Sequence, residues 1–146
     1  MINITEYLKR IGKARGFGIQ SPWAYRVVTE VIGEKMPYYC YEDIDRVYKK
    51  RSERKFRKLV FRIRNFVYPH NVEIVTTDNL SDDTCISRCS PHGALIVTGI
   101  YENNDARQQW KQFAARNDVG IVFDLYHFAI CFFDLDIYKQ YYKLNF

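Results

Sequence analysis

The stretch from Ser52 to Thr77 constrains the fold more than any other part of the chain. Its first part predicts a helix over 52–68, because apolar residues recur there at a spacing of three and four and basic residues fill the other side. Pro69 cannot continue a helix, and Val72–Thr77 then has the composition of a buried strand. A helix followed directly by a strand is typical of layered α/β folds. The apolar helix positions are Phe56, Leu59, Val60, Ile63, Phe66 and Val67.

The rest of the chain continues this alternation of helices and strands. Before it, apolar spacing predicts a helix over 3–11, Ser21 and Pro22 predict the start of a helix that Gly33 ends, and 41–50 predicts a short helix. The buried face of the second of these helices is expected to consist of Ala24, Val27, Val28, Val31 and Ile32. After it, we expect a turn with a short helix over 78–92, a buried strand over 94–100, a helix from Asn103 or Asn104 to Arg116, and three short strands in GIVFDLY, FAICFFD and YYKLNF. The later helix should turn Ala106, Trp110, Phe113 and Ala114 inward.

These elements predict one α/β domain over 1–146, with a mostly helical part over 1–68 and a sheet part over 71–146. The sheet is expected to be small, layered and Rossmann-like, with about five strands. The strands that begin at 72 and 94 should be parallel neighbours if 78–92 crosses over the sheet. The links between the last three strands are too short for helices, so we expect an antiparallel C-terminal edge.

Positive charge is concentrated in one segment. The chain has a net charge of +5, and residues 46–64 hold ten Lys or Arg and one Glu, so this segment carries +9 and the remainder −4. Such a segment is typical of a nucleic-acid surface and equally of an ordinary solvated helix face. In the first interpretation the phosphate contacts come from Arg51, Arg54, Lys55, Lys58 and Arg62. Bases would stack on the tyrosines just upstream, Tyr38, Tyr39, Tyr41 and Tyr48.

Composition argues against several other classes of protein. Apolar residues make up 47% of the chain, which is typical of a globular protein and not of a disordered one. No apolar run reaches the roughly 20 residues of a membrane-spanning helix, and the N-terminal stretch lacks the apolar region of a secretion signal. The four cysteines are too scattered for a disulfide scaffold, so we expect reduced thiols in the cytoplasm.

Several segments, in their order and spacing, resemble a family of small bacterial class I S-adenosylmethionine-dependent methyltransferases. GFGIQSPWAYRVVTEVI is similar to the family's N-terminal Gly-Ile-His-Ser-Pro-Phe signature and the apolar helix after it. LIVTGIYENNDARQQW resembles a strand followed by a helix that carries a Trp, here Trp110. VGIVFDLYHFAICFFD and KQYYKLNF resemble the family's closing strands. The resemblance covers roughly residues 1–75 and 93–146 and implies a Rossmann-like fold.

The departures from the family lie where the cofactor would bind. The first core strand of such enzymes carries a Glu and a glycine-rich turn, because only glycine lets the backbone approach the cofactor closely. This chain keeps Glu73, but the glycine positions hold Val75, Thr76, Thr77, Asp78 and Asn79. Thr98 and Gly99 replace paired acids, Gln20 replaces the signature His, and Glu102-Asn103 replaces Trp-Ser. Residues 78–92 are also too few to contain the family's further central strands.

The resemblance and its departures together predict a degenerate methyltransferase-like protein that serves as a binding or interaction module. Its cofactor-binding residues would be Glu73 and Asp78, as vestiges, with no catalytic residue and no bound cofactor. The alternative is an active methyltransferase that binds S-adenosylmethionine in a reduced site near the same two carboxylates. The question of enzymatic activity therefore stays open at this point, with the missing glycines and strands favouring its absence.

Three smaller groups have a functional and a structural interpretation. Asp78, Asp82 and Asp83 form an acidic group with Glu73 that suits a cation or remnant pocket, but Asp also forms turns and caps. Cys85, Cys89 and His92 could bind a metal with Asp82, although zinc sites use tighter cysteine pairs. Asp124 and His127 could perform acid–base chemistry. We favour the structural interpretation for each group and predict no metal site.

The C-terminal third is rich in aromatic residues. Alternation along the strands should bury about half of them and leave the others exposed. An exposed aromatic patch, or an uncovered strand at the edge of a shortened sheet, would be protected by pairing with a second subunit. We therefore predict a homodimer. The residues are Phe123, Tyr126, Phe128, Phe132, Phe133, Tyr138, Tyr141, Tyr142 and Phe146.

Overall fold

The computed structural model describes residues 4–10, 18–89, 91–133, 136 and 138–146. The helices are α1 (Ile4–Arg10), α2 (Pro22–Arg26) with a π-helical continuation (Val27–Ile32), α3 (Tyr41–Val47), α4 (Arg51–Val67), α5 (Thr84–Cys89) and α6 (Asn104–Ala114). The strands are β1 (Val72–Thr76), β2 (Ala94–Thr98), β3 (Ile121–Asp124), β4 (Phe128–Phe132) and β5 (Gln140–Lys143). The predicted order of helices and strands is confirmed, with boundaries that differ by a few residues.

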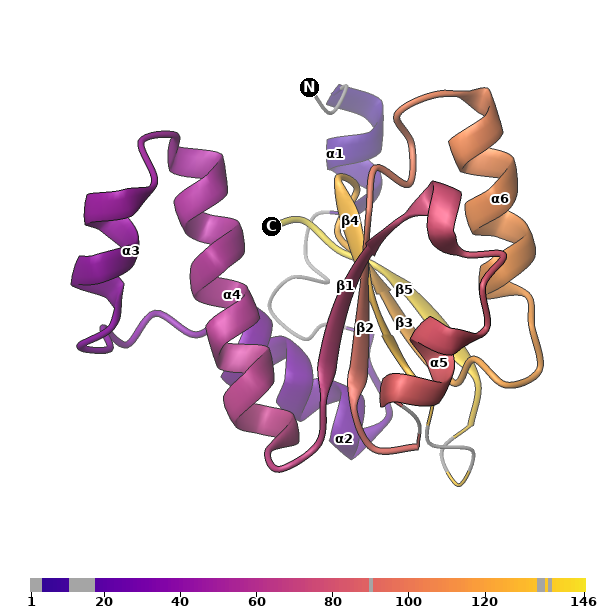
Figure 1. Cartoon of the computed structure of the whole chain (residues 1–146), viewed down its shortest axis with the longest axis horizontal. Helices are drawn as coiled ribbons and strands as arrows, with labels where there is room; N and C mark the ends of the chain where they lie inside the picture. The colour runs from indigo at the N-terminus through magenta and orange to yellow at the C-terminus, as the bar shows by residue number, and fades with distance from the viewer. Residues whose placement is uncertain (1–3, 11–17, 90, 134–135, 137) are drawn as a thin grey trace.

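The strands form one sheet in the order β1-β2-β4-β3-β5. β1 and β2 are parallel neighbours, as predicted, with Val72 opposite Ala94 and Thr76 opposite Thr98. β3 and β4 form an antiparallel hairpin, and β4 also pairs with β2. β1, β2, β3 and β5 therefore run in one direction and end at the same edge of the sheet (Figure 1).

The prediction of an antiparallel C-terminal edge is wrong. The edge strand β5 runs parallel to β3, and the antiparallel strand β4 lies inside the sheet. The reason is the short turn between β3 and β4, which puts β4 beside β2 and leaves only β3 with a free edge. β4 also ends on the side where β3 begins, so a strand that returns from it along β3 runs parallel to β3.

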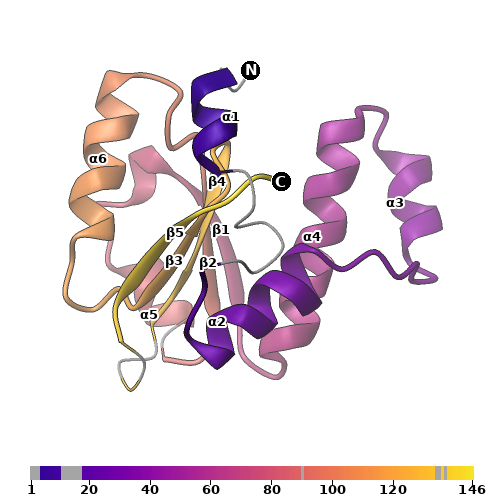
Figure 2. The ribbon, with the colours of Figure 1, turned by 180° about the vertical axis from the view of Figure 1, so that it is seen from behind.

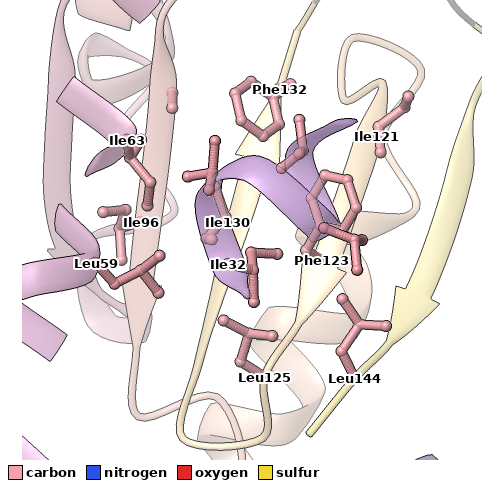
Figure 3. Close-up of a cluster of buried hydrophobic side chains, with 14 of the residues drawn as sticks. Ile32, Leu59, Ile63, Ile96, Ile121, Phe123, Leu125, Ile130, Phe132 and Leu144 are labelled. Atoms are coloured by element: carbon pink, nitrogen blue, oxygen red, sulfur yellow. The ribbon is translucent and has the colours of Figure 1, made fainter. Parts of the chain in front are cut away.

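Helices cover both faces of the sheet (Figures 1 and 2). On one face, α2 and α4 pack on Ile96, Phe123 and Ile130, and Figure 3 shows these side chains beside Leu59 and Ile63 of α4. On the other face, α5 and α6 pack on a second cluster that contains Leu95, Val97 and Cys131. Successive strand residues alternate between the two clusters, as the period of two in a strand requires. The fold is thus a mixed α/β sheet between two helical layers.

The second helix begins and ends at the residues that the sequence indicates. The Ser21 side chain accepts a hydrogen bond from the backbone N–H of Ala24 at 3.3 Å, and Pro22 occupies the first turn. The Gly33 N–H donates to the carbonyl oxygen of Val28 at 2.8 Å, which closes the wider turn of a π-helix. This π-helical stretch was not predicted. The predicted buried face is confirmed, with Ala24, Val27, Val28, Val31 and Ile32 in the core.

The first helix differs from the prediction in what it buries. Its apolar stripe is exposed, with 76% of Ile4 and 58% of Leu8 accessible to solvent, and Ile11 lies outside the described residues. Arg10 is instead completely buried, at the edge of the sheet where β3 ends. In the part of the chain that the structure describes, no helix has both the length and the apolar character needed to cross a membrane.

Candidate functional site

A polar cavity of about 500 Å³ lies at the carboxyl ends of β1 and β2. Ligands of open α/β sheets bind at such strand ends. The lining includes hydroxyl, carboxylate and imidazole groups that could hydrogen-bond a small polar molecule. Its residues are Thr76, Thr98, Gly99, Tyr101, Glu102, Tyr126 and His127.

Gly99 is the one lining position of this cavity where glycine is required. Its φ of +74° lies in the left-handed region, and a Cβ atom there would meet Oε2 of Glu102 at 2.9 Å. Because the chain turns sharply at Gly99, Tyr101 and Glu102 both return to the cavity that Thr98 lines. Gly99 thus shapes this wall of the cavity.

Asp124, at the end of β3, is completely buried beneath this cavity's wall. Its Oδ1 accepts hydrogen bonds from Nη1 of Arg10 at 2.9 Å and from the backbone N–H of Tyr126 at 2.8 Å. Its Oδ2 accepts hydrogen bonds from the hydroxyl groups of Tyr101 and Tyr141, the latter at 2.7 Å. These bonds hold Tyr126 at a φ of 74°, which is uncommon for a residue with a side chain. They confirm the structural interpretation of Asp124.

The two tyrosines of this cluster are hydrogen-bonded phenols and not activated bases. Burial, together with the nearby carboxylate of Asp124, raises the pKa of Tyr101 to about 12. Burial and the Asp124 charge also raise the pKa of Tyr141, whose hydroxyl accepts a hydrogen bond from Nε1 of Trp110 at 2.9 Å. Partial burial lowers the pKa of His127, so its neutral imidazole faces the cavity near pH 7. The site therefore offers neutral donors and acceptors and the Glu102 carboxylate.

The turn after β1 is filled by its own side chains on its core side, whereas Thr77, Asp78, Leu80 and Ser81 of the same turn line a hollow that faces α6. Thr77–Asn79 form a 3₁₀ turn, in which the Leu80 N–H donates to the Thr77 carbonyl oxygen at 3.2 Å. Leu80 and Ile86 are buried in the cluster under α5 and α6, and Val75 packs against it. A hollow of about 320 Å³ lies between this turn and α6, lined by side chains that include Asp78, Gln109 and Arg116.

The two residues predicted as vestiges of a cofactor site lie toward opposite ends of β1. Glu73 is near its beginning and faces Arg88 of α5, with 4.0 Å between the charged atoms. Asp78 is exposed beyond the other end of the strand. The three residues from Glu73 to Thr76 alone span about 10 Å of strand. The structure does not bring the two carboxylates together.

The neighbouring acids form local contacts. Asp82 accepts a hydrogen bond from the backbone N–H of Thr84 at 3.0 Å, which caps α5 and lowers the pKa of Asp82. Asp83 pairs with Arg116 at 2.7 Å. Asp82 thus serves as the turn and cap residue that the structural interpretation predicts, whereas the Asp83 side chain forms an ion pair.

Cys85 and Cys89 point into the core and not toward a common ligand. Both are buried, and burial raises the pKa of Cys89 to about 12. The His92 ring lies beside the His70 ring, with 5.1 Å between ring centres and 54° between the ring planes. Among the residues that the structure describes, no three His, Cys, Asp or Glu side chains are placed to hold a metal ion.

The structure brings together four of the five basic residues predicted for nucleic-acid contact. Arg51, Arg54, Lys55 and Lys58 line a hollow of about 470 Å³ with Asp45. Arg62 differs from the other four because only 8% of it is exposed. Its guanidinium donates to the carbonyl oxygens of Val31 and Ile32, at 2.6 and 3.4 Å, and to the Tyr41 hydroxyl at 2.9 Å. Arg62 therefore stabilises the fold and is not placed to contact a phosphate.

Sequence reasoning missed Arg10 and Tyr101 as parts of a site. In the sequence, the neighbours of Arg10 are those of a solvated residue in a short basic helix, and its partner Asp124 lies 114 positions away. Tyr101 follows a strand that ends in Gly99, and this position after a strand is the signal that could have indicated it.

Comparison of this chain with protein-family models, with curated proteins and with solved structures finds no match.

Proposed function

We propose that this protein is a shortened, degenerate relative of the class I S-adenosylmethionine-dependent methyltransferases, which acts as a binding or interaction module without methyl transfer. The observation that carries the proposal is the filled turn after β1. Leu80 and Ile86 are buried where this family needs an open, glycine-lined approach to the cofactor.

The cavity at the carboxyl ends of β1 and β2 supports the binding part of the proposal. It lies where open α/β sheets bind ligands and is separate from the filled turn, since Thr76 lines the cavity and Leu80 does not. A binding module needs such a site but needs no side chain whose pKa is shifted toward neutral pH for catalysis. The pKa of Tyr101, which lines the cavity, is instead raised by burial. In this proposal the protein has kept the scaffold and the position at which ligands bind, and it has lost the cofactor site.

The alternative is an active methyltransferase with a reduced cofactor site around Glu73 and Asp78. The distance between these residues along β1 argues against it, because one cofactor would have to contact both ends of the strand. Glu73 also faces Arg88 on the α5 side.

Isothermal titration calorimetry with S-adenosylmethionine and S-adenosylhomocysteine tests the proposal. We expect no saturable heat for either compound, because buried side chains occupy the space of the adenosyl group. A dissociation constant in the micromolar range for either one would contradict the proposal. A crystal soaked with S-adenosylhomocysteine gives a second readout, and electron density of the ligand beside Val75 would contradict it as well.

A further inference from the structure

Two adjacent hollows lie along α4. The ribbon shows α4 on the opposite face of the sheet from α5 and α6 (Figure 1). The first, of about 470 Å³, is the basic hollow around Arg51 and Arg54. The second, of about 570 Å³, lies between α4, the segment after the π-helical stretch and the C-terminal residues. Lys55 and Lys58 line both hollows, which makes them parts of one groove, called the α4 groove below.

The basic hollow has more positive than negative charge. Its only acid among the lining residues is Asp45, which pairs with Lys58 at 2.7 Å and with Arg54 at 3.7 Å. Burial and the like charges of Arg51 and Arg62 lower the pKa of Lys55. A bound anion would relieve this repulsion, since an opposite charge at short range favours the charged form of a lysine. The hollow is therefore suited to phosphate groups.

The second hollow is lined by two aromatic rings, Tyr41 and Phe146, and by charged side chains that include Glu34 and Lys35. The Lys58 ammonium lies 5.0 Å from the centre of the Tyr41 ring, and the Lys55 ammonium lies 4.5 Å from the centre of the Phe146 ring. The hydrogen bond from Arg62 holds Tyr41 in place. Sites for single-stranded nucleic acids combine these two features, a cationic track for the backbone and aromatic rings on which bases stack.

We propose that the α4 groove binds single-stranded nucleic acid. Phosphates contact Arg51, Arg54, Lys55 and Lys58, which span about 10 Å of the helix axis, and a base enters the second hollow beside Tyr41 and Phe146. A membrane surface fits less well because the two aromatic rings of the groove, Tyr41 and Phe146, line a hollow. An acidic peptide would use the basic hollow but has no need of the aromatic one. The proposal does not depend on the methyltransferase ancestry.

Fluorescence anisotropy with a labelled twelve-nucleotide oligothymidylate tests the phosphate contacts. The double variant R51E/R54E should bind at least tenfold more weakly at 50 mM salt. Its slope of log K against log salt should be less steep by about 1.4, because each phosphate contact to a single strand contributes about 0.7. The matched control is R64E/K111E, which makes the same change in net charge at two exposed residues outside the groove and should alter affinity less than twofold.

The variant Phe146→Ala tests the base position. It should weaken binding of oligothymidylate and leave binding of inorganic polyphosphate unchanged, because polyphosphate has no base. Circular dichroism melts of every variant report whether the fold is retained, and the salt slope of a folded variant remains informative even if its melting temperature falls.

Four outcomes would overturn the proposal. The first is the absence of oligothymidylate binding at 50 mM salt, and the second is an equal loss of affinity in R51E/R54E and R64E/K111E. The third is an equal effect of Phe146→Ala on the binding of oligothymidylate and of polyphosphate. The fourth is binding of polyphosphate, polyglutamate or vesicles of anionic phospholipid that is as tight as binding of oligothymidylate. None of them bears on the calorimetry with S-adenosylmethionine, so this proposal and the proposed function can fail separately.

Discussion

Asp124 joins three segments of the chain although its side chain has no access to solvent. It contacts Arg10 of α1, Tyr101 after β2 and Tyr141 of β5. In Asp124→Asn the guanidinium of Arg10 would lose its buried partner and keep only the partly exposed Glu6 carboxylate, at 3.7 Å. Breaking a buried ion pair by removing one partner costs about 3–5 kcal/mol. We expect this loss in the free energy of unfolding, measured by urea denaturation.

The matched control for this prediction is Asp118→Asn, which also removes one carboxylate from an arginine pair. Asp118 pairs with Arg116 at 2.8 Å, but both side chains are partly exposed, so we expect a loss of only about 0–1 kcal/mol. Equal losses in the two variants would show that the Asp124 cluster is not a buried anchor.

Tyr101 should make the stability of the protein depend on alkaline pH. Its pKa is raised from 10.0 to about 12 in the folded state, mainly by burial and then by the hydrogen bond to Asp124. A group with a raised pKa contributes stability that is complete below its unfolded pKa and is lost as the pH rises through its folded pKa. The free energy of unfolding should therefore fall between pH 10 and about pH 12. Tyr101→Phe should make this fall less steep, whereas Tyr39→Phe, at a fully exposed ring, should not.

The residue scale is also where prediction from the sequence is weakest. The caps at Ser21 and Asn103 were predictable because a cap depends on positions three residues apart. The pair of Arg10 and Asp124 was not, because burial of a charge depends on a partner that only the tertiary fold supplies. The same holds for Arg62, whose sequence neighbourhood is that of an exposed basic face.

At the scale of elements, one arginine adds polar contacts to the apolar packing between α4 and the π-helical stretch. Arg62 donates to the carbonyl oxygens of Val31 and Ile32 and to the Tyr41 hydroxyl of α3. Arg62→Lys keeps the charge but cannot present the planar fork to several acceptors at once. We expect the free energy of unfolding to fall by about 1.5–3 kcal/mol, the usual value of one hydrogen bond to a charged group.

Arg64→Lys is the control for this element-scale prediction, because Arg64 is an exposed residue of the same helix. Its stability should change by less than about 0.5 kcal/mol, as at most surface positions. Thermal and urea unfolding of both variants measure the difference. A loss in Arg64→Lys as large as that in Arg62→Lys would contradict the role assigned to the three acceptors.

Elements with a strong period were predictable, and connections were not. The apolar faces of α4 and α6 followed from spacing alone, and Trp110 and Phe113 are buried as expected. The direction of β5 was not predictable, because it depends on which edge of the β3–β4 hairpin remains free. The candidate cavity likewise combines two turns from different strand ends, so its position in the sheet was predictable but its composition was not.

At the scale of the whole molecule, most of the aromatic residues near the C-terminus serve the core. Phe123, Phe128, Phe132 and Phe133 are buried, whereas Tyr138 is 89% exposed. An aromatic patch is therefore a smaller candidate interface than the sequence indicated. The two edge strands, β1 and β5, are the stronger candidates, since in the described part of the chain each pairs with one strand alone. β1 is the longer of the two, with five residues against four in β5.

The homodimer prediction thus becomes a prediction about β1. Sedimentation velocity at high micromolar concentration should detect a dimer, and Thr76→Lys should dissociate it, because a lysine on an edge strand opposes pairing with a second chain. Gln108→Lys makes the same change in charge at an exposed position of α6 and should leave the dimer intact. If Tyr138→Ser dissociates the dimer and Thr76→Lys does not, the interface is the aromatic patch. A monomer at every concentration would contradict both versions, and the edge of β1 would then have to be protected by the twist and shortness of a five-residue strand.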